Sequence, residues 1–216
     1  MIEFISTLYN EEEEIIDLLL HVSPYVDKIN LIDDGSTDTT LARIGYFKVF
    51  HKEATHKTVA KTIEHTGLCE IGRIRALEMC DDDSWIIMLD ADERFAPGVL
   101  EKIVEFCNNP PEGVTHLYFS QREFIDNSPV AAFAKVKVFK KSAAHLPEII
   151  HRDPSFDGTG VGYDWVVIHR KTVSKQVMRE LQYLDTYDKL LDEGKVTQDD
   201  VNWFKGMHHY VRDRHG

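Results

Sequence analysis

The stretch Trp85-Ile86-Ile87-Met88-Leu89-Asp90-Ala91-Asp92-Glu93 consists of five apolar residues followed by two carboxylates one residue apart. Such an apolar run predicts a strand buried on both faces, as in the centre of a parallel sheet, and open α/β sheets bind ligands at the carboxyl ends of such strands. If the chain stays extended, the side chains of Asp90 and Asp92 fall on one side and can hold a divalent cation against a diphosphate. An acidic, solvated turn is the alternative for this motif taken alone.

Length and composition describe an ordinary globular protein. The 216 residues suit one domain, or one domain with a helical appendix, and 43% apolar with 29% charged residues argues against disorder. The formal net charge of −12 weakens the case for electrostatic binding to nucleic acid. A local basic groove stays open as an alternative because four lysines lie close together in the sequence: Lys135, Lys137, Lys140 and Lys141.

Cysteine usage and hydropathy bear on where the protein works. Three scattered cysteines are too few for a disulfide framework or a zinc site, which favours a reducing cytoplasmic location. The sequence has no basic leader followed by an apolar core, and no stretch approaches the roughly 20 apolar residues of a membrane span. We therefore expect a soluble, unsecreted protein without a membrane span.

Alternating apolar runs and turn residues predict alternating strands and helices, beginning with a βαβ unit. Asn10 is expected to cap the first helix. The segment 53–65 is expected to be loop with some helix, and the strands at 114–120 and 132–139 to form an antiparallel pair. Strands are expected at 2–8, 28–32, 47–51, 85–89, 114–120, 132–139 and 165–169, and helices at 11–20, 39–44, 71–79, 97–106, 173–191 and 199–211, with a stop at Gly194 and a cap at Thr197.

Two further polar features lie next to predicted strands. The turn Asp33-Asp34-Gly35-Ser36-Thr37-Asp38 sets two carboxylates at a strand end, where they can read a nucleobase or ribose or simply belong to a capped turn. Arg73 and Arg75 stand on the helix before the central strand, where a guanidinium can clamp a phosphate, although most surface arginines on helices do not.

Three motifs in this order, residues 7–12, 31–38 and 85–93, resemble the GT-A glycosyltransferases of the large family 2 type. The resemblance extends to residues 73–77, near the family's Arg-Asn-x-Ala element, although Ile74 and Arg75 do not reproduce the Arg-Asn pair. It covers the first half of the chain closely and the second half loosely. It implies an α/β GT-A fold with a Rossmann-like, mixed, mostly parallel sheet flanked by helices. The catalytic domain would span 1–170, with a helical extension at 171–216 packed on it.

The resemblance also implies a site. The donor would be a nucleotide diphosphate sugar, with UDP expected, and the cofactor Mn²⁺ or Mg²⁺. A metal on the departing diphosphate would neutralise the charge that develops there. The implied nucleotide-binding residues are Thr7, Tyr9, Glu11, Asp33, Asp34, Arg73, Arg75 and Asp90, and the implied metal ligands are Asp90, Asp92 and His169.

The general base is less well defined. An inverting transferase needs a group within hydrogen-bond reach of the acceptor hydroxyl. Relatives of this shape often present a His-Glu pair after the basic strand, whereas this chain reads Ile150-His151-Arg152-Asp153, with arginine in place of the glutamate. Asp153, Glu148 and His151 are therefore the candidates, and Asp153 is favoured.

The leading hypothesis is a metal-dependent glycosyltransferase acting on an acceptor hydroxyl of a saccharide, a small molecule, a protein or a modified base in nucleic acid. A non-catalytic nucleotide-binding or regulatory module with the same fold is the alternative, because the glutamate of the His-Glu pair is missing. A phosphotransferase or hydrolase using Asp90 and Asp92 ranks last, because the downstream threonine of aspartyl-phosphate enzymes is absent.

Overall fold

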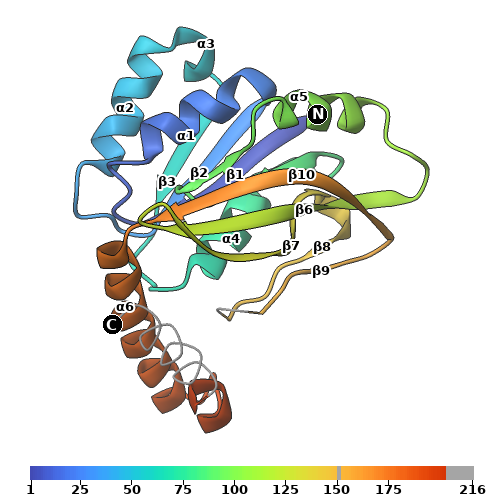
Figure 1. Ribbon diagram of the computed structural model, residues 1–216. Helices are drawn as coiled ribbons and strands as arrows, with labels where there is room; N and C mark the ends of the chain where they lie inside the picture. Colours follow the sequence, from blue (N-terminus) through green and yellow to red (C-terminus); the bar gives the residue numbers. More distant parts are fainter. Residues whose placement is uncertain (150–151, 203–216) are drawn as a thin grey trace. The chain divides into compact units, whose positions relative to one another are not determined.

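The computed structural model describes residues 1–149 and 152–202. The chain divides into two compact units, Met1–Arg170 and Lys171–Gly216. The first unit contains an eight-stranded mixed sheet in the order β3-β2-β1-β4-β7-β6-β10-β5, flanked by helices (Figure 1). This architecture confirms the predicted α/β class with a Rossmann-like mixed sheet.

Half of the sheet is parallel, and β1 lies near its centre. β1 (Ile2–Leu8) pairs in parallel with β2 (Lys28–Asp33) on one side and β4 (Trp85–Met88) on the other, and β3 (Thr58–Thr62) continues the parallel part beyond β2. Because parallel strands point the same way, the carboxyl ends of these strands share one edge of the sheet. The polar motifs that follow β1, β2 and β4 therefore meet at that edge.

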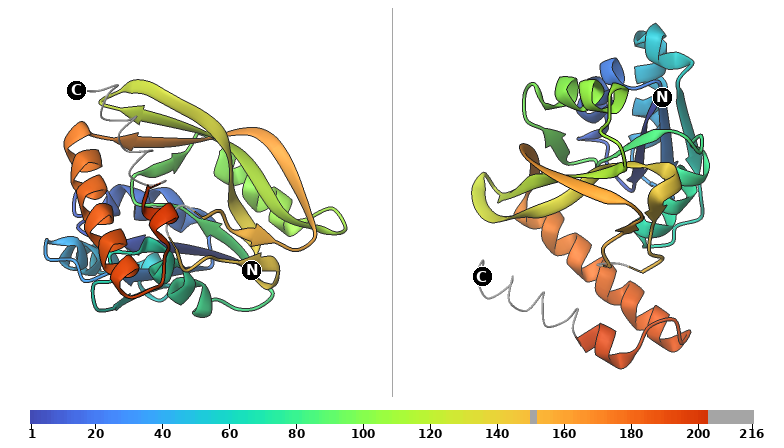
Figure 2. Two further views of the ribbon diagram at one scale, coloured as in Figure 1. Left: turned by 90° about the horizontal axis from the view of Figure 1, so that it is seen from below. Right: turned by 90° about the vertical axis from the view of Figure 1, so that its right-hand side faces the viewer.

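The other half of the sheet is built on a long hairpin. β6 (Val114–Ile125) and β7 (Ser128–Lys140) pair antiparallel, which confirms the predicted pairing, and β7 pairs antiparallel with β4. A two-residue turn joins them, with Asp126 and Asn127 at φ 45° and 66°, as tight hairpins require. β10 (Thr159–Lys171) follows β6 in the sheet and pairs antiparallel with β5 (Glu93–Phe95), and Figure 2 shows β6, β7 and β10 as long ribbons.

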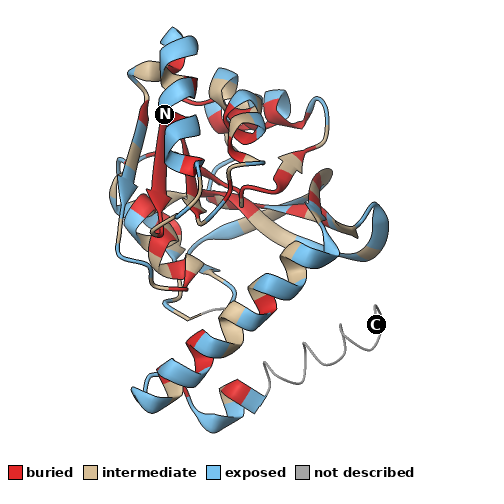
Figure 3. Cartoon of the chain, turned by 90° about the vertical axis from the view of Figure 1, so that its left-hand side faces the viewer, coloured by how far each residue is buried: buried red, intermediate tan, exposed pale blue. Residues whose placement is uncertain are grey.

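Two apolar cores lie on opposite faces of the sheet. Phe4 and Leu8 of β1 pack in the larger core with side chains of α1, α2 and α5, whereas Ile5 packs on the other face with Ala76 of α4. The buried strands and inward helix faces stand out in Figure 3. The helical segments of this unit are α1 (Ile15–Val22), η1 (Ser23–Tyr25), α2 (Thr40–Phe50), α3 (Lys52–Thr55), α4 (Cys69–Glu78), α5 (Val99–Asn108) and η2 (Lys141–Ala143), and a separate small pair consists of β8 (Ala144–His145) and β9 (Ser155–Phe156).

The predicted strand at 47–51 is wrong, because α2 continues through Phe50. Thr40, Ile44 and Phe47 are buried at intervals of four and three residues, which is the period of a helix lying on a core. The aromatic and β-branched residues of this stretch favoured a strand, but the helix buries only one of them fully and leaves Val49 exposed. The expected third strand lies later, as β3, within the segment expected to be loop and helix.

Asn10 does not cap α1 as predicted. Its backbone is left-handed, with φ of 53°, and its Oδ1 accepts hydrogen bonds from the backbone N–H groups of Thr37 (2.8 Å) and Asp38 (3.3 Å). A turn follows in which Ile15 N–H donates to the carbonyl of Glu11, so the helix begins four residues later than expected. Asn10 therefore links the first two motifs.

The second unit contains a single long described helix. α6 (Val173–Asp192) begins after the cap Thr172 and ends before Gly194, whose φ is 69°, in agreement with the predicted helix and stop. Thr197 and Asp200 exchange hydrogen bonds at the start of the next turn, and the remainder of the helix expected at 199–211 lies outside the described residues. No helix within residues 1–149 and 152–202 is long and apolar enough to cross a membrane.

His21 gives the fold a testable pH dependence. Its Nε2 accepts a hydrogen bond from Phe95 N–H at 3.1 Å, and burial together with the Arg94 guanidinium lowers its pKa from 6.5 to about 4. The unfolded chain therefore binds the proton more readily, so stability present above pH 6.5 is lost as the pH falls toward 4, by on the order of 2 kcal/mol. Urea unfolding at pH 7.5 and 4.5 measures this loss. His21→Gln, which keeps an acceptor, should lose less, and equal losses would contradict the assignment.

Candidate active site

The carboxyl edge of the parallel strands brings together the three motifs found in the sequence. Ser6 Oγ donates to the carbonyl of Leu89 at 2.8 Å, which ties the end of β1 to the end of β4. Glu11, a predicted nucleotide-binding residue, is 3% exposed and its N–H donates to Thr40 Oγ1 at 2.8 Å, which ties the first motif to α2. Buried hydrogen bonds therefore join β1 and the segment after it to the residue that follows β4 and to the start of α2 at this edge.

Asp33, at the end of β2, uses only one of its two carboxylate oxygens for hydrogen bonds within the described residues. The residue is fully buried, and its Oδ2 accepts from Ser36 N–H at 3.2 Å. Its Oδ1 has no hydrogen-bond partner within the part of the chain that the structure describes. A buried acceptor left without a donor costs roughly 1–3 kcal/mol. An N–H group of a bound molecule would relieve that cost.

Asp34, by contrast, holds a loop in place. Its Oδ1 accepts from the N–H and the hydroxyl of Thr66, and its Oδ2 accepts from Gly67 N–H and lies 3.0 Å from Nδ1 of His65. The loop thereby sets the His65 ring parallel to Tyr9, with ring centroids 4.1 Å apart. His65 was not predicted from the sequence, because it falls in the segment 53–65, which was expected to be loop with some helix.

Thr7 and Gly72 bring α4 against the end of β1. Thr7 Oγ1 donates to the carbonyl of Cys69 at 3.1 Å, and a Cβ built on Gly72 would lie 2.2 Å from Thr7 Cγ2. Only glycine fits this approach of helix to strand. The close packing sets the next residue, Arg73, beside the end of β4.

Arg73 and Asp90 form a tight ion pair. Arg73 Nη2 lies 2.5 Å from Asp90 Oδ1, and Nη1 lies 3.6 Å from Glu70 Oε1. Burial by itself would raise the pKa of Asp90, but the charges of Arg73 and Lys137 hold that pKa well below its ordinary value. Arg75 is exposed and pairs with Glu78 on its own helix. Of the two arginines considered, the structure therefore brings only Arg73 to Asp90.

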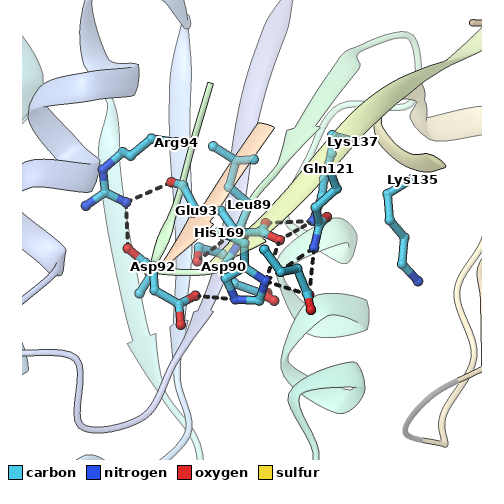
Figure 4. A network of polar contacts seen from close by, with 12 residues as sticks. Leu89, Asp90, Asp92, Glu93, Arg94, Gln121, Lys135, Lys137 and His169 are labelled. Carbon is cyan, nitrogen blue, oxygen red and sulfur yellow. Dashed lines mark hydrogen bonds and ion pairs between the residues drawn. The ribbon is translucent and has the colours of Figure 1, made fainter. Parts of the chain in front are cut away.

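Asp92 lies against His169, which comes from β10 (Figure 4). Asp92 and His169 are 4% and 5% exposed, and His169 Nε2 lies 3.1 Å from Asp92 Oδ1. Within residues 1–149 and 152–202, no three acidic, histidine or cysteine side chains form a ready cation cage. A carboxylate and an imidazole nevertheless suit Mn²⁺, and Mg²⁺ is commonly held by one or two carboxylates plus substrate phosphates. The residues thus fit a cation shared with a diphosphate.

Glu93 and Lys137 form a buried ion pair behind this turn (Figure 4). Their side chains are 1% and 8% exposed, and Lys137 Nζ lies 2.7 and 2.6 Å from the two carboxylate oxygens. Glu93 Oε2 also accepts from Asp90 N–H at 3.0 Å. The pair therefore fixes the backbone of the Asp-Ala-Asp turn.

The lysine run does not form the basic groove that the sequence left open. Lys135 pairs with Asp153 at 2.5 Å, Lys137 with Glu93, and Lys141 with Asp82 at 2.8 Å. Lys140 Nζ lies 5.5 Å from the centre of the Trp85 ring. The β6–β7 register shifts between Val136 and Val138, so Lys137 does not continue the regular alternation from Lys135. The lysines therefore meet separate partners.

Two of the base candidates, Glu148 and Asp153, lie between β8 and β9. The Asp153 side chain is 78% exposed and pairs with Lys135, and Glu148 is exposed. His151 lies outside the described residues. The same loop meets α4 at a small pocket lined by Glu70, Arg73, Leu146, Pro147, Arg152 and Pro154. Arg152, which stands where relatives have glutamate, therefore lies across a pocket from Arg73.

The sheet order and the acidic carboxyl edge define a GT-A type of glycosyltransferase. Residues 4–156 match the family described as glycosyl transferase family 2. The chain therefore belongs to this family, which confirms the family and the glycosyltransferase class predicted from the sequence. A search of curated proteins finds no match.

Solved structures agree on the fold. A mannosyltransferase from Pyrobaculum calidifontis, PcManGT, solved with GDP-Man and Mn²⁺, aligns with a TM-score of 0.62 at 12% identity, covering 91% of this chain and 65% of that one. S. aureus TarS 1–349, solved with UDP, gives a TM-score of 0.59 at 12% identity, covering 94% and 69%. In the longer TarS structure the matched part is 42% of that chain. This chain thus corresponds to part of each relative.

Replacing Lys137 tests the ion pair behind the turn. Lys137→Met should destabilise the protein by about 3–5 kcal/mol, because it leaves the Glu93 carboxylate buried without its cation. Adding Glu93→Gln should recover much of that loss, since the pair is then removed together. Urea unfolding of the single and double variants measures both. Equal stability of the two variants would mean that the charges are not coupled, and Lys135→Met serves as an exposed control.

Proposed function

We propose that the protein transfers a sugar from a UDP-sugar to an acceptor hydroxyl in a metal-dependent reaction. The observation that supports this most directly is the meeting of the Arg73–Asp90 pair with the Asp92–His169 pair at the carboxyl edge of the sheet. An acidic pair for a cation and an arginine for phosphate oxygens are the groups that a nucleotide diphosphate needs. Residues 171–216 are proposed as an extension of this catalytic domain.

The choice of UDP rests on the hydrogen-bonding capacity of Asp33. Its single unpartnered oxygen, Oδ1, matches the single ring N–H of uracil, whereas guanine presents a ring N–H and an amino group together. Tyr9, at the end of β1, offers an aromatic face beside the base. One related structure contains UDP and another contains GDP-Man, so the choice of donor has to be argued from the residues of this chain.

Each remaining residue has a proposed task in the reaction. Asp92, His169 and Asp90 would hold Mn²⁺ or Mg²⁺, which when bound supplies positive charge to the leaving diphosphate. Arg73 donates to an oxygen of the nucleotide through its Nε, a buried donor without an acceptor within the described residues. Asp153 accepts the acceptor's proton, after release from Lys135, with Glu148 and His151 as the alternatives.

The acceptor is proposed as a hydroxyl of a saccharide, a small molecule, a protein or a modified base in nucleic acid. The three cysteines are free thiols, which suits the proposed cytoplasmic location. The pairing of Lys135, Lys137 and Lys141 with carboxylates removes the one feature that favoured nucleic acid over the other acceptors.

Calorimetric titration with UDP-sugars, each with and without Mn²⁺, tests the donor and metal together. Wild-type protein should bind one donor only with metal, and Asp92→Asn should weaken that binding at least 10-fold while leaving the unfolding transition unchanged. Asp83→Asn, which changes an exposed carboxylate before β4, is the control. Unchanged metal-dependent binding in Asp92→Asn would refute the metal assignment.

Nucleotide release separates the enzyme from a binding module. Asp153→Asn should leave donor binding intact and reduce the release of UDP at least 100-fold, since a general base contributes about 10²–10⁴-fold. Glu148→Gln is the matched comparison on the same loop. Release that survives in Asp153→Asn but falls in Glu148→Gln would transfer the role to Glu148. Donor binding with no release from wild type, with every class of acceptor present, would favour the regulatory module.

A further inference from the structure

His169 has a second carboxylate on the side away from Asp92. Its Nδ1 lies 3.1 Å from Oε1 of Glu123 and 3.2 Å from Nε2 of Gln121. Both residues come from β6, two positions apart, so their side chains leave the strand on one face. Gln121 is 3% exposed and the Glu123 side chain 26% exposed. Neither residue was predicted from the sequence to belong to the site.

The contacts determine which ring nitrogen carries a proton. Gln121 Nε2 lies 3.3 Å from Glu123 Oε1, so the amide and the ring nitrogen converge on one carboxylate oxygen. An ionised carboxylate only accepts, so in its contact with Glu123 the Nδ1 atom of His169 donates, and the Gln121 amide then donates to Glu123 and not to the ring. In the neutral ring the lone pair is then on Nε2, which faces Asp92 Oδ1 at 3.1 Å. Two acceptors that close repel each other unless a proton or a cation lies between them.

Glu93 is a less suitable partner for the ring. Its Oε1 is 3.9 Å from His169 Nδ1, and both of its carboxylate oxygens already accept from Lys137. Glu123 is thus the carboxylate that sets the orientation of the imidazole. A carboxylate that accepts from the ring N–H opposite the metal-binding nitrogen is the arrangement by which proteins orient a histidine toward a metal ion.

We propose that Glu123 is a positioning residue: it holds the proton on Nδ1 of His169 so that Nε2 is presented, with Asp92, to a divalent cation. This inference rests on the proposed function, because it assigns the orienting partner of a proposed metal ligand. Glu123 itself contacts neither the cation nor the donor in this role.

Two readouts in one variant series test it. All variants carry Gln121→Met, so that the amide cannot turn its oxygen toward the ring. Calorimetry measures Mn²⁺ affinity, and ¹⁵N NMR of histidine-labelled protein without metal reports whether Nδ1 is protonated. Against the Gln121→Met reference, Glu123→Ala should weaken Mn²⁺ binding about 10–100-fold and move the proton off Nδ1. Glu123→Gln, which keeps an acceptor, should retain both properties, and Glu112→Ala, an exposed carboxylate before β6, is the charge control.

The outcomes separate this inference from the proposed function. The positioning role would be overturned if Glu123→Ala kept both its Mn²⁺ affinity and the proton on Nδ1. It would also be overturned if Glu112→Ala lost as much Mn²⁺ affinity as Glu123→Ala. Wild-type protein that binds no Mn²⁺ would overturn the proposed metal dependence. In that case the NMR readout still tests the role of Glu123. Loss of the Nδ1 proton in Glu123→Ala, but not in Glu123→Gln or Glu112→Ala, would support Glu123 as the residue that orients the ring. An Nδ1 proton retained in Glu123→Ala would refute that role.

Discussion

The buried ion pair between Glu93 and Lys137 is the interaction on which the rest of the site depends. Glu93 joins the turn after β4 to the side chain of a β7 lysine and, through Oε2, to the backbone of Asp90. The parallel and antiparallel halves of the sheet are thus joined by charge directly behind the Asp-Ala-Asp turn. Such a pair is costly to desolvate, and its value lies in fixing one arrangement of the turn.

The two consecutive aspartates at the end of β2 have different surroundings. Asp34 is committed to the loop that carries His65, and Asp33 uses only one of its two oxygens for hydrogen bonds within the described residues. Neighbouring residues on a strand face opposite ways, so one carboxylate can hold structure while the other faces the site. The resemblance alone treated the two as equivalent.

Local patterns explain what could be predicted from the sequence. The apolar run ending at Asp90 specified the central strand because five consecutive apolar residues need burial on both faces. The strand predicted at Phe47 was wrong because the aromatic residue type favours a strand locally, whereas its burial on a helix depends on the core beneath α2. Lys137 and Glu123 could not be assigned, because their roles follow from partners 44 and 46 residues away, Glu93 and His169, which only the sheet order brings near.

The side chain of Asn10 has a consequence for binding. Its oxygen receives two N–H groups of the second motif, so the walls formed by the ends of β1 and β2 are joined by the protein alone. A donor that enters such a pocket does not have to order those backbones itself. The entropy that ordering would cost on association is therefore largely lost during folding, and the ends of β1 and β2 are preorganised relative to each other.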